Sequence, residues 1–102
     1  MFELNNKVII VSGGTGILGA AFIKAIASQG GKVVILGRNE QIGNKRAAEI
    51  NKEGAEAIFI AADVLEKEQL ELARDKVLST FGRIDGLVNG AGGNIPEAVL
   101  TP

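Results

Sequence analysis

A glycine-rich segment at residues 12–19 is the first part of this sequence whose residue types suggest chemistry. Glycines let a backbone turn sharply and approach a charged ligand, and a helix that starts at such a turn presents free N–H groups to an anion. Many tight strand–helix turns carry glycines and bind nothing, but this one follows the first apolar run and precedes a helical pattern. The segment therefore predicts a pyrophosphate-binding loop, with six candidate contacts: Gly13, Thr15, Gly16, Ile17, Leu18 and Gly19.

A cation follows the second apolar run, about 20 residues beyond the glycine loop. A domain built for NAD usually carries Asp or Glu here to hold the ribose hydroxyls. This chain has Gly37 and then Arg38, whose planar and permanent charge matches a 2′-phosphate. We therefore expect NADP(H) to be favoured over NAD(H), with Arg38 and Asn39 as contacts. Glu40 could still reach a ribose hydroxyl, and Arg38 could be a solvated residue at the end of a strand.

Asp63 and Val64 follow the third apolar run. The Asp63 carboxylate could accept a hydrogen bond from an adenine amino group while Val64 packs against the ring. Asp63 is also followed three residues later by Glu66, a spacing that equally predicts a helix capping box. The two interpretations stay open at this point.

Small residues fill positions 89–93, after the fourth apolar run. Backbone of this kind lets a ribose and a nicotinamide ring lie close, and Asn89, Ala91 and Gly92 are the candidate contacts. The alternative is a plain glycine-rich turn.

Four strands and three helices must position these segments. Near-continuous apolar runs at 8–11, 33–36, 57–60 and 84–88 are typical of strands that are covered on both faces, as in a parallel sheet. The stretches between them are long enough for helical crossovers. The pattern predicts an α/β doubly wound sheet of Rossmann type with strand order 3-2-1-4 and a ligand at the switch point between strands 1 and 4.

The helical patterns also predict buried faces. Ala47 and Ile50 form the thin apolar face of the second helix, about 40–53, and a glycine in left-handed conformation should end each helix. The expected buried residues of the first helix, 16–29, are Ile17, Leu18, Ala21, Phe22, Ala25 and Ile26. Those of the third are Leu70, Ala73, Val77 and Phe81.

Composition narrows the function. The 102 residues carry a net charge of −1, which gives no reason to expect nucleic acid or an anionic membrane as a partner. There is no cysteine, histidine or tyrosine, so we expect no metal site. No secretory signal or membrane span is visible, and the default expectation is a cytoplasmic protein.

Taken in this order, the four segments resemble the short-chain dehydrogenase/reductase family over residues 7–95. The combination of Gly82, Arg83, Ile84 and Asp85 leading into Asn89 makes this resemblance more specific than any single motif. It implies an oxidoreductase that transfers hydride between a nicotinamide cofactor and a carbonyl or alcohol. By this resemblance Gly13 and Gly19 match the family's loop glycines, Asp63 its adenine-binding aspartate, and Asn89, Ala91 and Gly92 its strand-4 motif.

The sequence departs from the family pattern at three positions. Ser12 replaces a threonine, Ile17 stands where the middle loop glycine is expected, and Gly90 replaces a second asparagine. The spacing of the loop glycines is more like that of the extended, epimerase-like branch, whereas the later motifs favour the compact branch. The run from 89 to 94 is similar to sugar-acid oxidoreductases of the mannonate or gluconate type.

The family's catalytic residues cannot be assigned here. The family uses a tyrosine with a lysine four residues later, and this chain has no tyrosine. We therefore expect residues 1–102 to be the N-terminal, apparently truncated dinucleotide-binding part of a single Rossmann domain, inactive alone and homo-oligomeric at full length. The alternatives are a non-catalytic NAD(P)-binding sensor or degenerate module, or an unrelated α/β fold such as a methyltransferase, which does not explain positions 89–93.

Overall fold

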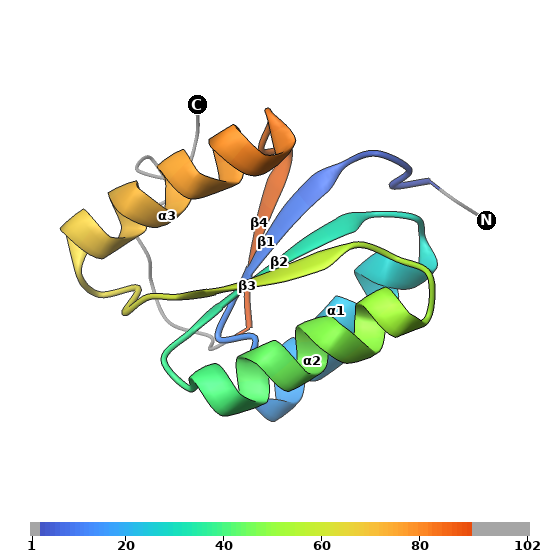
Figure 1. The fold of residues 1–102 in the computed structure, drawn as a ribbon, viewed down its shortest axis with the longest axis horizontal. Helices are drawn as coiled ribbons and strands as arrows, with labels where there is room; N and C mark the ends of the chain where they lie inside the picture. Colours follow the sequence, from blue (N-terminus) through green and yellow to red (C-terminus); the bar gives the residue numbers. More distant parts are fainter. Residues whose placement is uncertain (1–2, 91–102) are drawn as a thin grey trace.

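Alternating apolar runs and helical patterns give a single parallel sheet with helices on both faces (Figure 1). The structure, a computed structural model, describes residues 3–90. The strands are β1 (Val8–Ser12), β2 (Lys32–Gly37), β3 (Ala57–Ala61) and β4 (Gly86–Asn89). The helices are α1 (Ile17–Ser28), α2 (Glu40–Lys52) and α3 (Lys67–Phe81).

The strands are hydrogen-bonded in the order β3-β2-β1-β4, and every pair is parallel. This confirms the predicted Rossmann-type order. In the register of the sheet, Ser12 at the end of β1 pairs with Leu36 of β2 on one side and with Asn89 of β4 on the other. The carboxyl ends of these three strands therefore form one row, and the segments that follow them emerge at the same edge.

Two apolar layers hold the sheet between its helices. Alternate residues of a strand point to opposite faces, so that β2 contributes Val34 and Leu36 to the layer under α3, and Val33 and Ile35 to the layer under α1 and α2. All four side chains have no exposed surface. Figure 1 shows α3 on one side of the sheet and the other two helices on the opposite side. This two-sided burial explains why the strands are continuously apolar.

The buried face of α1 differs from the prediction. Its buried residues are Gly19, Ile23 and Ile26, whereas Ile17 is 92% exposed and Leu18 is 53% exposed. Of the six residues predicted to be buried, Ile26 is buried and Phe22 packs partly against the core, while Ala21 and Ala25 are exposed. The helix is apolar nearly all the way round, so its pattern does not define one face. The helix packs most closely at Gly19, which has no side chain to hold it away from the loop after β1.

The other two helices follow their predicted faces. Ala47 and Ile50 of α2 are buried, as are Leu70, Ala73 and Val77 of α3, and Phe81 packs partly against the same layer. The three glycines that follow the helices, Gly30, Gly54 and Gly82, have φ of 84°, 96° and 79°. These are the left-handed stops that the sequence predicts.

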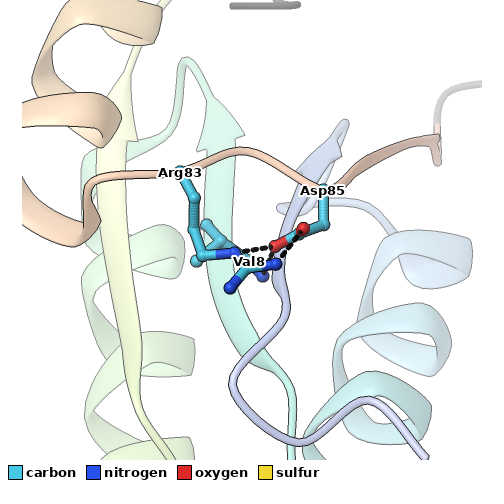
Figure 2. Close-up of polar contacts among 3 residues, drawn as sticks. All are labelled: Val8, Arg83 and Asp85. Carbon is cyan, nitrogen blue, oxygen red and sulfur yellow. Dashed lines mark hydrogen bonds and ion pairs between the residues drawn. The ribbon is translucent and has the colours of Figure 1, made fainter.

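Three residues close the sheet at the amino end of β1, a contact that we name the amino-end clasp (Val8, Arg83 and Asp85; Figure 2). Asp85 accepts a hydrogen bond from the Val8 amide at 2.8 Å, and its own amide donates to the Val8 carbonyl oxygen at 2.8 Å. Arg83 binds the same carboxylate with both Nε (2.8 Å) and Nη2 (2.7 Å). β4 begins at Gly86, two residues after Ile84, where the apolar run predicts its start.

Within residues 3–90, none of the helices combines the length and apolar character needed to cross a membrane.

Candidate dinucleotide-binding site

The glycine loop lies at the carboxyl end of β1 and is packed too tightly for side chains at two positions. A Cβ atom on Gly19 would lie 2.3 Å from the Gly13 carbonyl oxygen and 2.7 Å from the Gly14 Cα. One on Gly14 would lie 2.6 Å from Cγ2 of Ile35. Gly13 itself has a φ of 66°, a conformation that side chains disfavour. The loop therefore forms a stretch of backbone largely without side chains, the glycine cradle, that packs against the start of α1.

The first turn of α1 offers unpaired amide donors. Its N-cap is Gly16, which has no side chain to cap the helix, and the amides of Ile17, Leu18 and Gly19 donate to no other residue within 3–90. Free N–H groups at a helix N-terminus, with the positive end of the helix dipole, favour an anion. The residues present fit a pyrophosphate group.

The end of β2 lies directly beside this loop. The Gly14 amide donates to the Leu36 carbonyl oxygen at 3.1 Å. A Cβ atom on Gly37 would lie 2.9 Å from Cγ2 and 3.0 Å from Oγ1 of Thr15, so that the Thr15 side chain occupies the space over Gly37. Arg38 follows with an exposed side chain. The structure thus places a cation where an NAD-binding domain usually has a carboxylate.

Asn39 and Glu40 have roles in starting α2. The Asn39 side-chain oxygen accepts a hydrogen bond from the Ile42 amide at 3.0 Å, which makes Asn39 the N-cap. Glu40 is the acidic residue of the first turn, where it favourably meets the helix dipole. The sequence marks Asn39 as a candidate contact. In the structure its side-chain oxygen is already used to cap α2.

Asp63 does not form the alternative capping box. Its Oδ1 accepts from the Leu65 amide at 3.0 Å, closing a local turn, and α3 begins later, with Glu66 as an N-cap that makes no side-chain bond. The Asp63 amide donates to Oε1 of Gln69 at 2.7 Å. The same short polar side chain can serve a cap or a turn, and here it serves the turn. Val64 packs partly against the α3 layer.

Asn89 lies at the end of β4, against Ser12. The fully buried Ser12 hydroxyl is 3.2 Å from Oδ1 of Asn89, and the Gly90 amide donates to the Ser12 carbonyl oxygen at 2.8 Å. A Cβ atom on Gly90 would lie 2.8 Å from that oxygen and 3.1 Å from the Gly19 Cα. The glycine that departs from the family pattern therefore allows β4 to approach the glycine loop. Ala91 and Gly92 lie outside the described residues.

Two features of this region carry no motif in the sequence. Arg46 of α2 reaches the glycine loop, where its Nη1 donates to the carbonyl oxygens of Gly14 (2.5 Å) and Gly16 (2.6 Å). Gln69 holds the Asp63 backbone, as described above. No local pattern marks Arg46, because the two carbonyl oxygens that it contacts lie about 30 residues away in the sequence.

A carboxylate at the opposite end of the sheet from the glycine loop, that of Asp85, has a shifted pKa. Hydrogen bonds from Arg83 and then from the Val8 amide hold the pKa of Asp85 below its usual range, outweighing its partial burial. This carboxylate acts in the amino-end clasp, on the far side of β1 from the glycine loop.

A parallel sheet of order 3-2-1-4 with alternating strands and helices and a glycine-rich turn beyond β1 is a Rossmann-like α/β fold. The family model for short chain dehydrogenases matches residues 7–101. The chain belongs to the short-chain dehydrogenase family.

Relatives and solved structures agree with this assignment. An uncharacterized oxidoreductase of Bacillus subtilis, UxuB, is 42% identical over 97 residues, which cover 95% of this chain and 35% of the relative. Cyclopentanol dehydrogenase of a Comamonas species is 35% identical over 92 residues, 90% of this chain and 37% of that protein. The chain thus spans about a third of the length of these curated relatives.

Among solved structures, a putative D-mannonate oxidoreductase from Haemophilus influenzae with bound NAD superposes with a TM-score of 0.83. It is 38% identical and is matched over 93% of this chain and 34% of its own. NAD+-bound xylitol dehydrogenase gives a TM-score of 0.79 at 32% identity, covering 83% of this chain and 33% of the other. The fold is therefore one that binds nicotinamide dinucleotides in these neighbours.

Proposed function

We propose that residues 1–102 are the cofactor-binding front of a single Rossmann domain in an oxidoreductase that prefers NADP(H). The observation that carries the proposal is the convergence of three segments at one edge of the sheet. Ser12 at the end of β1 pairs with Leu36 on one side and with Asn89 on the other. This register brings together the glycine loop, the end of β2 with Arg38, and the end of β4 with Asn89. The NAD-bound structures of its neighbours support a nicotinamide dinucleotide as the cofactor class.

Each segment has a distinct part in holding the cofactor. The amides at the start of α1 would bind the pyrophosphate, Asp63 and Val64 the adenine, and Asn89, Ala91 and Gly92 the nicotinamide side. When bound, the nicotinamide ring supplies or accepts the hydride that converts a carbonyl to an alcohol or the reverse. The residues of this chain bind and orient the cofactor, and none of them is proposed as a catalytic acid or base.

Arg38 is the residue that we propose selects NADP(H). Gly37 offers no carboxylate to a 2′-hydroxyl, and the side chain that occupies the space above it belongs to Thr15. A guanidinium pairs strongly with phosphate. Glu40, at the start of α2, is already placed favourably by the helix dipole.

Titration of the full-length protein with NADPH and with NADH, followed by cofactor fluorescence, tests this proposal. We expect NADPH to bind at least about tenfold more tightly, and Arg38→Met to weaken NADPH by about 10–100-fold with little change for NADH, since one charge-assisted pairing contributes about 1.5–3 kcal/mol. Lys45→Met, on the exposed side of α2, removes one positive charge as a matched control. Tighter binding of NADH by the wild type, or an equal loss of both cofactors in Arg38→Met, would contradict NADP(H) selection.

For the substrate we propose a sugar acid of the mannonate or gluconate type. Support comes from the sequence run at 89–94 and from the likeness to a protein described as a putative D-mannonate oxidoreductase. Oxidation of D-mannonate and D-gluconate by the full-length protein with NADP+ can be followed by cofactor absorbance. Turnover of simple secondary alcohols but of neither acid would reject this substrate class.

A further inference from the structure

Arg46, on the mostly polar helix α2, donates hydrogen bonds to backbone carbonyl oxygens of the glycine loop. It lies in the middle of α2, is half-buried, and points its Nη1 at two carbonyl oxygens of the glycine loop, those of Gly14 and Gly16. Within residues 3–90 no carboxylate pairs with it, although Glu49 lines the same shallow groove between α1 and α2. The positive charge is therefore directed at the loop backbone.

Fixing these two oxygens also fixes two amide groups. In a planar trans peptide the C=O and the following N–H point in opposite directions. The carbonyl of Gly14 shares its peptide with the Thr15 amide, and that of Gly16 with the Ile17 amide. Because both oxygens turn toward the same Arg46 nitrogen, both amides are turned away from α2. Neither amide donates to another residue within 3–90.

We propose that Arg46 is a positioning residue for the cofactor, holding the Thr15 and Ile17 amides ready for the pyrophosphate. This inference rests on the proposed dinucleotide-binding function. Two carbonyl oxygens that converge beside an anion site would repel the anion, and the guanidinium offsets their partial charge. An arginine suits this role because it is permanently charged and carries several rigidly placed donors. Preorganised donors spare the cost of ordering the loop when the ligand arrives.

The first test compares full-length wild type, Arg46→Met and Arg46→Lys in fluorescence titrations with NADH and NADPH. Since the pyrophosphate is common to both cofactors, we expect Arg46→Met to weaken both by a similar factor of about ten. Arg46→Lys, which keeps the charge, should recover part of the loss. Lys24→Met, on α1 in the same groove, removes one charge without touching the loop and serves as the matched control.

The second test needs no cofactor. Hydrogen exchange of the Gly14 and Gly16 amides, which donate to the carbonyl oxygens of Leu36 and Gly13, should be faster in Arg46→Met than in wild type, while exchange in β2 and α3 stays unchanged. Unchanged loop exchange and unchanged affinity would overturn the inference, and so would a loss confined to NADPH, which would make Arg46 a reader of the 2′-phosphate. If the wild type binds neither cofactor, the proposed function fails, whereas the exchange comparison still decides whether Arg46 holds the loop.

Discussion

The hydroxyl of Ser12 donates to the side-chain oxygen of Asn89 over 3.2 Å and so joins the carboxyl ends of β1 and β4. Ser12 is the one buried polar residue among the buried side chains of residues 3–90. Its backbone oxygen also accepts from the Gly90 amide. This pair adds a side-chain contact to the backbone ladder between the two strands that flank the proposed cofactor site.

Replacing Ser12 by Ala removes this donor from a fully buried position. We expect the free energy of unfolding to fall by about 1 kcal/mol, the typical net contribution of a buried hydrogen bond. Urea denaturation of the full-length protein measures the change. Ser28→Ala is the control, because the exposed Ser28 hydroxyl bonds only within its own helix and should matter by less than about 0.5 kcal/mol. Equal effects of the two substitutions would contradict the structural role of Ser12.

The glycine loop can be tested by two alanine substitutions that differ in the space available. Gly19→Ala places a Cβ 2.3 Å from the Gly13 carbonyl oxygen, whereas on Gly16 the nearest such contact is 3.4 Å. The loop must shift in the first variant and can stay in place in the second. We expect Gly19→Ala to weaken dinucleotide binding by at least about tenfold, because the cradle moves, and Gly16→Ala to change it little. Cofactor titration measures both, and comparable losses would argue against the cradle.

The contact between α2 and β3 depends on Gly43. A Cβ there would lie 2.1 Å from Cδ1 of Phe59. Gly43→Ala should destabilise the protein by about 1–3 kcal/mol, the usual cost of overpacking. In the double variant with Phe59→Leu the two effects should not add, because the smaller side chain makes room for the methyl group. Asn44→Ala, exposed on the same helix, should be neutral or slightly stabilising. Additive effects in the urea-denaturation cycle would exclude this contact.

The amino-end clasp predicts a pH dependence. The pKa of Asp85 is lowered in the folded state, chiefly by Arg83 and the Val8 amide. The contribution of Asp85 is therefore fully present above its unfolded pKa of about 3.9 and is lost as the pH falls through the lower folded value. Asp85→Asn should cost about 1 kcal/mol near neutral pH, since the exposed ion pair itself contributes little.

The measurement is urea denaturation of wild type and Asp85→Asn between about pH 7 and pH 2.5. The difference in unfolding free energy should be constant down to about pH 5 and should shrink below it as the wild-type carboxylate takes up its proton. A difference that stays constant to the lowest pH would show that the carboxylate charge contributes nothing to the clasp.

The fold could be predicted from the sequence because its signals are redundant. Four continuous apolar runs and glycines at the helix ends all favour the same parallel sheet, and the order 3-2-1-4 is confirmed. The buried face of α1 could not be predicted, since Ile17 and Leu18 are as apolar as Ile23 and only packing distinguishes them. Because Gly19 packs closely against the loop, α1 buries the face that carries Gly19, Ile23 and Ile26.

The candidate site was predictable where a residue type is tied to a backbone requirement and not where it depends on side-chain reach. Gly13 and Gly19 stand where the turn and the close contact need them. Arg46 lies 30 residues from Gly16 in the sequence, so its contact exists only in three dimensions. The turn that Asp63 closes with the Leu65 amide was equally beyond a local pattern, because a turn and a capping box use the same side-chain oxygen.

The amino-end clasp and the glycine loop stand at opposite ends of the five-residue strand β1, roughly 13 Å apart at about 3.3 Å per residue. Substitutions separated by more than about 10 Å without shared partners usually have additive effects. Stabilising substitutions at the clasp are therefore expected to leave the affinity of the proposed cofactor site unchanged. The length of β1 separates a contact that contributes to stability from the edge of the sheet where we propose that the ligand binds.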